Sequence, residues 1–240
     1  MKVLGIIPAR FGSTRFPGKP LIDIAGKSMI QRVYEQASKS VMISEVVVAT
    51  DDQRIFDHVK SFGGKSLMTS ENHSNGTERC GEVIKHYSDV DVVINIQGDE
   101  PLIKPQQLEK VIALFDDSEV KIGTLAKKID DIESIENPNR VKVVLDANSD
   151  ALYFSRYAIP FNKNNSNTAH YKHIGIYAWR LSTLKELLKL ESCELEKSES
   201  LEQLRWMYNG YKLRVAETTI ETPNIDTPED LEEVLSLLNQ

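Results

Sequence analysis

Residues 3–20 read VLGIIPARFGSTRFPGKP, a short apolar run followed by a loop that contains two glycines and three cations but no acid. The apolar run at 3–7 predicts a buried strand. In the loop, Gly12 and Gly18 would let backbone N–H groups approach an anion, while Arg10, Arg15 and Lys19 would neutralise phosphate charge. The stretch therefore predicts a phosphate site at the end of the first strand.

This loop differs from the two common glycine-rich nucleotide motifs. Five residues rather than four separate Gly12 from Gly18, and Pro20 replaces the Ser or Thr of a Walker loop. The glycine spacing of a dinucleotide-binding turn is also absent. A solvated basic turn is the alternative, although exposed turns seldom concentrate one sign of charge without acids.

Apolar runs rich in β-branched residues alternate with amphipathic stretches along the rest of the chain. This order predicts βα units around a mainly parallel, buried sheet, and hence an α/β fold. The expected strands are 3–7, 45–49, 91–96, 121–126, 141–145, 173–178 and 212–216. The expected helices are 28–38, 52–61, 77–87, 105–116, 181–190 and 199–208, the last ended by Gly210.

The clearest helix signal lies near the C-terminal end of the sequence. Thr227-Pro228-Glu229-Asp230 supplies an N-cap, a proline at the first helical position and acids that suit the helix dipole. Apolar residues at 231, 234, 235 and 238 then follow the spacing of one helix face.

Two carboxylates follow or precede these elements at positions suited to a metal ion. Ligands bind open α/β sheets at the carboxyl ends of strands, where Asp99 follows the strand at 91–96. Asp226 comes just before the last helix, whose capping is assigned to Thr227. Carboxylate oxygens suit Mg²⁺, so the pair predicts a metal site, with ordinary turn formation as the alternative for each aspartate.

Other polar motifs carry weaker signals. Gly76-Thr77-Glu78-Arg79 opens a helix whose free N–H groups suit an anion or a base carbonyl, although Arg79 could instead be a surface residue paired with Glu78 or Glu82. In the second half, spacing alone favours core packing for Tyr177 and a hydrogen-bonded position in a sheet for His173. Glu202 and Arg205 read as a solvated helix face.

Composition excludes several classes of function. Lys and Arg total 29 against 36 Asp and Glu, giving a net charge of −7 that argues against nucleic acid as the main partner. The two cysteines lack metal-ligand spacing, so neither a disulfide framework nor a zinc site is expected. No stretch approaches the ~20 apolar residues of a membrane span, so we expect a cytoplasmic protein.

The chain resembles the 3-deoxy-manno-octulosonate (Kdo) cytidylyltransferases over nearly its whole length. The matching stretches are IIPARFGSTRFPGKPL, VVVATDD, GTER, VVINIQGDEPLI, VKVVLD, ALYFSRYAIPF, YKHIGIYAWR, LEQLRWMYNG and IDTPEDL. The resemblance implies a Rossmann-like nucleotidyltransferase fold in one domain, 1–240, with about 150–200 covering the sugar and supporting a homodimer. It also implies a role in lipopolysaccharide biosynthesis.

The resemblance further implies a role for each matching residue. Catalysis falls to Arg10, Arg15, Lys19, Asp99 and Asp226, the two aspartates holding Mg²⁺. CTP would contact Ala9, Arg10, Ser13, Arg15, Lys19, Asn75, Gly76, Gln97 and Gly98. The acidic 3-deoxy-2-ulosonic sugar would contact Arg79, Gln97, Arg156, His173, Tyr177, Glu202 and Gln203. Asn75 stands where Ser is common in the family.

The implied reaction is attack by the anomeric C2 hydroxyl on the α-phosphorus of CTP with in-line loss of pyrophosphate. Positioning and charge neutralisation should dominate it. A second metal ion near the nucleophile would explain the lack of an obvious general base. The alternatives are a cytidylyltransferase for an 8-amino-8-deoxy Kdo, another ulosonic or sialic acid, or a polyol phosphate, and a nucleotide-binding module without turnover.

Overall fold

The computed structural model describes residues 1–12, 16–129, 131–164 and 168–238. They form two compact units, Met1–Glu109 with Thr222–Gln240, and Lys110–Glu221. The chain therefore leaves the first unit, builds the second and returns to the first for its last helix. Whether the two units act as the single domain expected from the sequence stays a prediction.

The first unit is built on parallel strands. Hydrogen bonding gives the order β5, β4, β1, β6, with every neighbouring pair parallel. Their bounds are β1 Val3–Ala9, β4 Glu45–Thr50, β5 Ser66–Met68 and β6 Val92–Asn95. The three central strands β1, β4 and β6 are buried almost throughout, as apolar strands covered on both faces should be.

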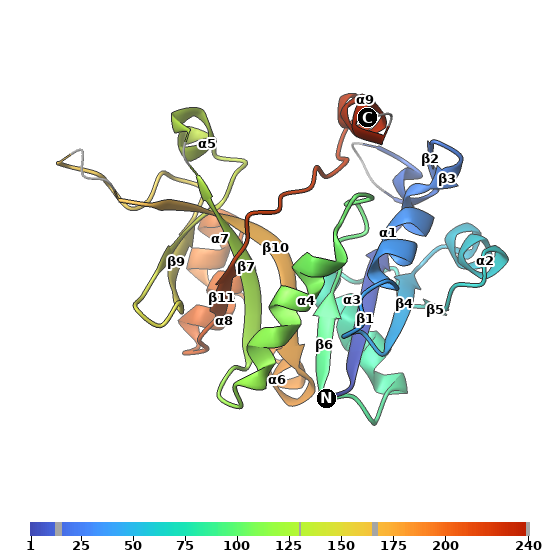
Figure 1. Cartoon of the computed structure of the whole chain (residues 1–240). Coiled ribbons are helices and arrows are strands. Elements are labelled where there is room, and N and C mark those ends of the chain that lie inside the picture. The colour runs from blue at the N-terminus through green and yellow to red at the C-terminus, as the bar shows by residue number, and fades with distance from the viewer. Residues whose placement is uncertain (13–15, 130, 165–167, 239–240) are drawn as a thin grey trace. The chain divides into compact units, whose positions relative to one another are not determined.

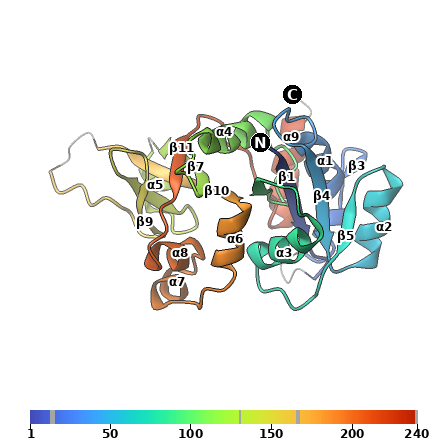
Figure 2. The ribbon, with the colours of Figure 1, turned by 90° about the horizontal axis from the view of Figure 1, so that it is seen from below.

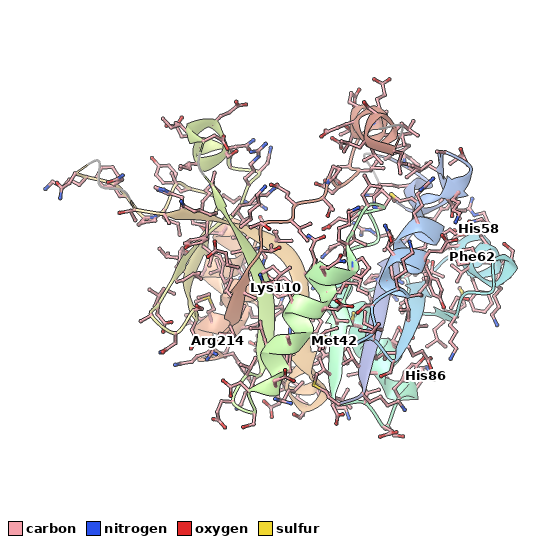
Figure 3. The ribbon with its side chains drawn as sticks, viewed as in Figure 1. Met42, His58, Phe62, His86, Lys110 and Arg214 are labelled. Carbon is pink, nitrogen blue, oxygen red and sulfur yellow. The ribbon has the colours of Figure 1, made fainter. Side chains whose placement is uncertain are left out.

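Helices flank this sheet as the alternating sequence pattern predicts. They are α1 Met29–Ala37, α2 Gln53–Ser61 and α3 Gly76–Val83. Helix α4, Pro105–Ala113, runs from the first unit into the second. Helices α1 and α3 contact β1 and β4, and α2 lies beside the edge strand β5 (Figures 1 and 2). The ring centroids of His58 on α2 and of Phe62, the C-cap of that helix, lie 5.5 Å apart (Figure 3). The His58 Nε2 atom is 2.7 Å from Ser28 Oγ, the N-cap of α1.

The last helix, α9 Pro228–Leu238, begins where the sequence predicts. The Asp230 backbone N–H donates to Thr227 Oγ1 at 3.4 Å, and Asp230 Oδ2 accepts from the Thr227 backbone N–H at 2.7 Å. This reciprocal pair is a capping box with aspartate in the place of glutamate. Its buried face, centred on Val234, packs against Ile24, Met29 and Ile225.

The second unit contains a mixed sheet. Strand β10 (His170–Arg180) pairs antiparallel with β7 (Ile122–Ile129) and with β8 (Lys142–Leu145). Strand β9 (Ala151–Ser155) pairs antiparallel with β8, and β11 (Arg214–Glu217) pairs parallel with β7. The few residues between β8 and β9 are too short for a parallel crossover, so an antiparallel turn joins them.

Short helices complete this unit: α5 Ile132–Glu136, α6 Leu181–Leu187, α7 Glu194–Glu199 and α8 Gln203–Tyr208. Helices α7 and α8 lie next to each other (Figures 1 and 2). Gly210, with φ of 84°, follows α8 and its N–H bonds Met207 O at 2.9 Å, which confirms its predicted role in ending that helix.

The α/β class and the order of strands and helices predicted from the sequence are confirmed, with corrections to several bounds. The expected helix at 199–208 begins later, as α8 at Gln203, because Ser200, with φ of 52°, ends the short helix α7, which was not expected. The expected helices at 77–87 and 105–116 tighten into 3₁₀ turns at 84–86 and 114–116.

Several short elements have too few residues for a periodic signal and were not expected. They are β5, β9, α5 and the hairpin of β2 (Asp23–Ile24) and β3 (Lys27–Ser28). Across the described ranges, no helix combines the length and apolar character that crossing a membrane would require.

We expect Val234→Ala to lower the free energy of unfolding by about 1–3 kcal/mol, because it removes fully buried methyl groups from the contact of α9 with Ile24, Met29 and Ile225. Chemical denaturation would measure the loss. The matched control is Leu237→Ala on the same helix, where the side chain is 44% exposed and the change should be small. Equal losses for the two variants would contradict this account of the packing.

Candidate active site

The loop that follows β1 folds back on itself. The Gly18 N–H donates to Phe11 O at 3.1 Å, and Gly18 has φ of 73°, a left-handed conformation that glycine adopts without strain. Arg10 is exposed. The Arg54 guanidinium lies 3.4 Å from the centroid of the Phe11 ring, a cation–π contact that anchors the loop to α2. The predicted phosphate ligands Ser13 and Arg15 lie outside the described residues.

Lys19 joins the two predicted metal-binding aspartates. Its Nζ atom donates to Asp99 Oδ2 at 2.9 Å, to Asp226 Oδ1 at 3.2 Å and to the Ile225 carbonyl oxygen at 2.8 Å. The Ile225 N–H donates to Asp99 O at 2.9 Å, which ties the segment before α9 to the end of β6. Three segments far apart in the sequence therefore meet at one ammonium group.

This arrangement has donors suited to a hard cation. The side chains of Asp99 and Asp226 keep 28% and 29% of their surface exposed, so both carboxylates remain reachable from solvent. Among the described residues there is no group of three or more His, Cys, Asp or Glu that could hold a metal. Water and ligand phosphates would have to complete the coordination, as they usually do for Mg²⁺. The residues present therefore fit such an ion.

Close backbone packing surrounds this cluster. A Cβ at Gly98 would lie 2.7 Å from Pro8 O, so only glycine lets the segment after β6 approach the end of β1. Gln97 and Lys19 are half-buried. Asn75 Oδ1 accepts from the Glu78 N–H at 2.8 Å and thereby caps α3, a structural role for a residue expected to contact nucleotide.

Asn95 is a site residue that the sequence reasoning missed. It is 6% exposed at the end of β6, and within the described part of the chain its Oδ1 atom has no hydrogen-bond partner. A Cβ at Gly76 would lie 3.1 Å from its Nδ2 atom. A buried amide oxygen without a donor is costly, so Asn95 is suited to accept from a ligand. Its place at a strand end was the available signal.

Arg79 is buried rather than exposed. It is 3% exposed, and its guanidinium donates to Asp51 Oδ2 at 2.7 Å and to Thr69 Oγ1 at 2.5 Å. The alternative of a surface arginine paired with Glu78 or Glu82 is therefore wrong. The ion pair fixes α3 to the residue after β4, and a role for Arg79 toward the sugar stays a prediction.

In the second unit, aromatic rings gather around His173. Ring centroids separate His173 from Phe154 by 4.9 Å and from Tyr177 by 5.2 Å. Thr124 Oγ1 lies 2.8 Å from Ile176 O, to which it donates, so His173 Nε2, 3.0 Å away, is the donor to that hydroxyl. Burial, with a smaller contribution from Lys172, lowers the pKa of His173 to about 3, which keeps the ring neutral.

Tyr177 belongs to the same cluster. Its ring centroid lies 5.1 Å from that of Trp206 on α8. Burial, followed by the negative charge of Glu202, raises the pKa of its hydroxyl well above the usual value. In the described chain neither Tyr177 Oη nor Trp179 Nε1 has a hydrogen-bond partner. These two buried groups can serve a bound ligand, in addition to the core packing expected of Tyr177.

Backbone carbonyl groups and Glu199 hold Arg156. Its Nε atom donates to Glu199 O at 2.7 Å, and its backbone N–H donates to Glu199 Oε2 at 2.8 Å. Lys142, fully buried, donates from Nζ to Arg156 O at 2.6 Å and to Asn137 O at 2.9 Å. Burial lowers the pKa of Lys142. Sequence reasoning overlooked this lysine, although a cation inside the apolar run VKVVL was a visible signal.

The remaining residues of this half lie at the start of α8. Gln203 is 4% exposed and Glu202 is half-buried. Arg205 does not belong to a solvated face, because its guanidinium Nε donates to Glu196 Oε2 at 2.8 Å and the side chain is 14% exposed. Each unit thus brings together several predicted residues, Lys19, Asp99 and Asp226 in the first and His173, Tyr177 and Glu202 in the second. Their roles toward a substrate stay predictions.

We expect the pKa of His173 to appear as a pH dependence of stability. Because the folded value is about 3 and the unfolded value about 6.5, the unfolded chain binds more protons between these limits. The stabilisation is complete above pH 6.5 and falls as the pH drops toward 3, by at most about 1.4 kcal/mol per unit. Urea denaturation at pH 7.5 and pH 5 should show that the free energy of unfolding falls less in His173→Gln than in the wild-type protein.

The control is His86→Gln, which changes an exposed histidine labelled in Figure 3. A wild-type protein and a His173→Gln variant that lose the same free energy between the two pH values would rule out a buried neutral imidazole.

Comparison with known proteins gives a consistent result. A family model described as cytidylyltransferase matches residues 4–218. The chain is 51% identical to the 3-deoxy-manno-octulosonate cytidylyltransferase of Parabacteroides distasonis, covering 99% of this chain and 98% of that protein. It is 52% identical to the protein of the same name from Bacteroides thetaiotaomicron, covering 96% of each.

Solved structures agree with the sequence relatives. A CMP:2-keto-3-deoxy-manno-octonic acid synthetase complexed with CTP superimposes with a TM-score of 0.95 at 45% identity, covering 100% of this chain and 99% of that one. The Rossmann-like nucleotidyltransferase fold is thereby confirmed. A 4-diphosphocytidyl-2C-methyl-D-erythritol synthase from Anaerococcus prevotii matches with a TM-score of 0.67 at 18% identity, covering 100% of this chain and 99% of that one, and shows the fold alone.

Proposed function

This chain belongs to the cytidylyltransferase family, and we propose that it transfers a cytidylyl group from CTP to 3-deoxy-manno-octulosonate with release of pyrophosphate. The observation that carries the proposal is the 51% identity with a 3-deoxy-manno-octulosonate cytidylyltransferase over 99% of the chain. The structural relative complexed with CTP supports the same nucleotide. The cluster of Lys19, Asp99 and Asp226 supplies chemistry that such a transfer needs.

In this reaction the anomeric hydroxyl oxygen of the sugar bonds to the α-phosphorus of CTP. The bond from that phosphorus to the oxygen bridging to the β-phosphorus breaks, pyrophosphate carries away the electron pair, and the hydroxyl proton passes to solvent. Negative charge on the triphosphate must be neutralised throughout. Lys19 contributes a cation next to the site, Arg10 is exposed on the preceding loop, and Ser13 and Arg15 keep their expected roles.

Asp99 and Asp226 would hold Mg²⁺, which neutralises phosphate charge and polarises phosphoryl oxygens when it is bound. Both carboxylates accept a hydrogen bond from Lys19 Nζ, so they face a common point. Lys19 compensates their charge there and would turn to the phosphates when a metal–nucleotide complex binds. The half-buried Gln97 is suited to contact the nucleoside, and so is Asn95 Oδ1, which has no hydrogen-bond partner among the residues that the structure describes.

The second unit would bind the acidic sugar. Arg156, which is held by Glu199, offers positive charge to the carboxylate of the sugar. The neutral His173 ring is held in place by its hydrogen bond to Thr124 and not by an ion pair. The buried Tyr177 hydroxyl, without a partner in the described chain, can bond a sugar hydroxyl. Cytoplasmic location, a homodimer and a place in lipopolysaccharide biosynthesis remain part of the proposal, on the strength of the family resemblance.

Pyrophosphate release tests the proposed function directly. CTP and Mg²⁺ would be offered with Kdo, its 8-amino-8-deoxy form or N-acetylneuraminate, with ATP and UTP as nucleotide controls. We expect release with CTP and Kdo. Preference for another acceptor would change the proposed substrate from Kdo to that sugar. Nucleotide binding without pyrophosphate release for any acceptor would overturn the proposed activity.

We predict that Asp226→Asn lowers the rate of pyrophosphate release by about 10²-fold or more, because it keeps the side-chain size but removes one of the two charges proposed to hold Mg²⁺. The Mg²⁺ concentration needed for half-maximal rate should rise. Asp89→Asn is the control, since that side chain is 90% exposed and pairs with Lys2. Unchanged activity and Mg²⁺ dependence in Asp226→Asn would show that this aspartate is not a metal ligand.

A further inference from the structure

The second unit contains a cavity of about 330 Å³ whose charged lining plays no part in the proposed transfer. Four cations, Lys127, Lys128, Arg140 and Lys172, line it together with the carboxylates of Glu221 and Asp131. Among the described residues that line it, cations exceed acids, although the whole chain carries a net charge of −7. The local reversal of charge indicates an anion site.

The strand register forces two of these cations together. Lys127 on β7 and Lys172 on β10 are directly opposite one another in the antiparallel pair. Like charges in this position repel, and the pair would destabilise the sheet without a counterion. Glu221, a few residues after β11, supplies one by bonding Lys127 Nζ at 2.9 Å through Oε2 and Lys172 Nζ through Oε1.

The pocket lies apart from the proposed sugar residues. His173 and Ala126 form the neighbouring register pair, and successive residues of a strand point to opposite faces of the sheet. Lys127 and Lys172 therefore stand on the face opposite the His173 ring. Binding at these lysines is independent of the contacts proposed for the acidic sugar.

Local hydrogen bonds account for much of the remaining polar lining. The Asp131 carboxylate accepts from the Ser134 N–H at 2.6 Å and caps α5, so one of the two acids is engaged by backbone. Arg140 Nη1 donates to Ser134 Oγ. The Glu221 pKa lies at about 2, because the two lysines lower it against the opposing effect of burial. The pocket thus strongly favours a negative charge.

We propose that this pocket binds a phosphate-type dianion, either free phosphate or the phosphoryl group of a small molecule, which competes with Glu221 for Lys127 and Lys172. The Glu221 side chain is 34% exposed, so an incoming anion can reach the lysines and displace it. The tetrahedral oxygens of such an anion can bond both ammonium groups and Arg140. Glu221 then acts as a resident substitute for the ligand.

The two possible roles of Glu221 predict different effects of Glu221→Gln on phosphate binding. If the pocket binds the anion, Glu221→Gln removes the competitor and tightens binding, and phosphate restores stability lost through repulsion between the lysines. If Glu221 serves only to neutralise the two lysines, the same change destabilises the fold without creating affinity for phosphate. If the pocket binds the anion, Lys172→Gln removes one of the cations that hold it and should weaken binding.

Isothermal titration of the full chain with inorganic phosphate, repeated with methyl phosphate, tests this proposal and distinguishes a free ion from a phosphoryl group. The protein would carry Lys19→Met to weaken phosphate binding at the proposed nucleotide site, and each Glu221 or Lys172 variant would be compared with this same background. We expect Glu221→Gln to tighten binding by about tenfold, Lys172→Gln to weaken it by about tenfold, and Lys172→Arg to retain it.

Lys197→Gln and Glu194→Gln provide the matched controls, because these residues form an exposed ion pair on α7 and should leave binding unchanged. Thermal unfolding with and without phosphate checks that each variant folds. Absence of binding in Glu221→Gln, or binding that Lys172→Gln leaves unchanged, would overturn the proposal. Either result is independent of pyrophosphate release from CTP, so the proposed transfer stands or falls separately.

Discussion

The hydrogen bonds of one ammonium group organise the candidate active site. Lys19 Nζ bonds the carboxylates of Asp99 and Asp226 and the Ile225 carbonyl, and so joins the loop after β1, the end of β6 and the segment before α9. Without a cation at this point, two carboxylates would face each other across a partly buried space and repel. The contact thus makes it possible to place two acids where a metal–phosphate ligand would bind.

Around that point, the parallel sheet brings the strand ends to one edge, and the turns after the strands determine how closely the segments pack there. Strands β1 and β6 are adjacent and parallel, so their carboxyl ends lie at the same edge. Gly98 lets the segment after β6 pass within contact of Pro8 O. The capping box of Thr227 and Asp230 fixes the start of α9 at Pro228, two residues after Asp226. Local rules of turn and cap geometry therefore determine how closely the two aspartates approach.

The second unit uses a different physical device, the burial of polar groups with few partners. Lys142 is fully buried and bonds backbone carbonyls, including that of Arg156. His173 is neutral and donates to Thr124, and Tyr177 lies between aromatic rings. Such groups have little freedom to reorient, which favours a preformed site. On the opposite face of the same sheet, the register places Lys127 beside Lys172 and makes a counterion necessary.

The sequence by itself determined the α/β class, the succession of strands and helices along the chain and the start of α9, because apolar periodicity and capping act over a few residues. It also located Asp99 and Asp226, since strand ends can be recognised locally. Only the tertiary structure decided that Lys19 bridges those aspartates, that Arg79 pairs with Asp51 inside the protein and that Lys127, Lys172 and Glu221 meet. Each of these contacts joins residues distant in the chain, and charge or residue type alone does not specify which distant partner a side chain will reach.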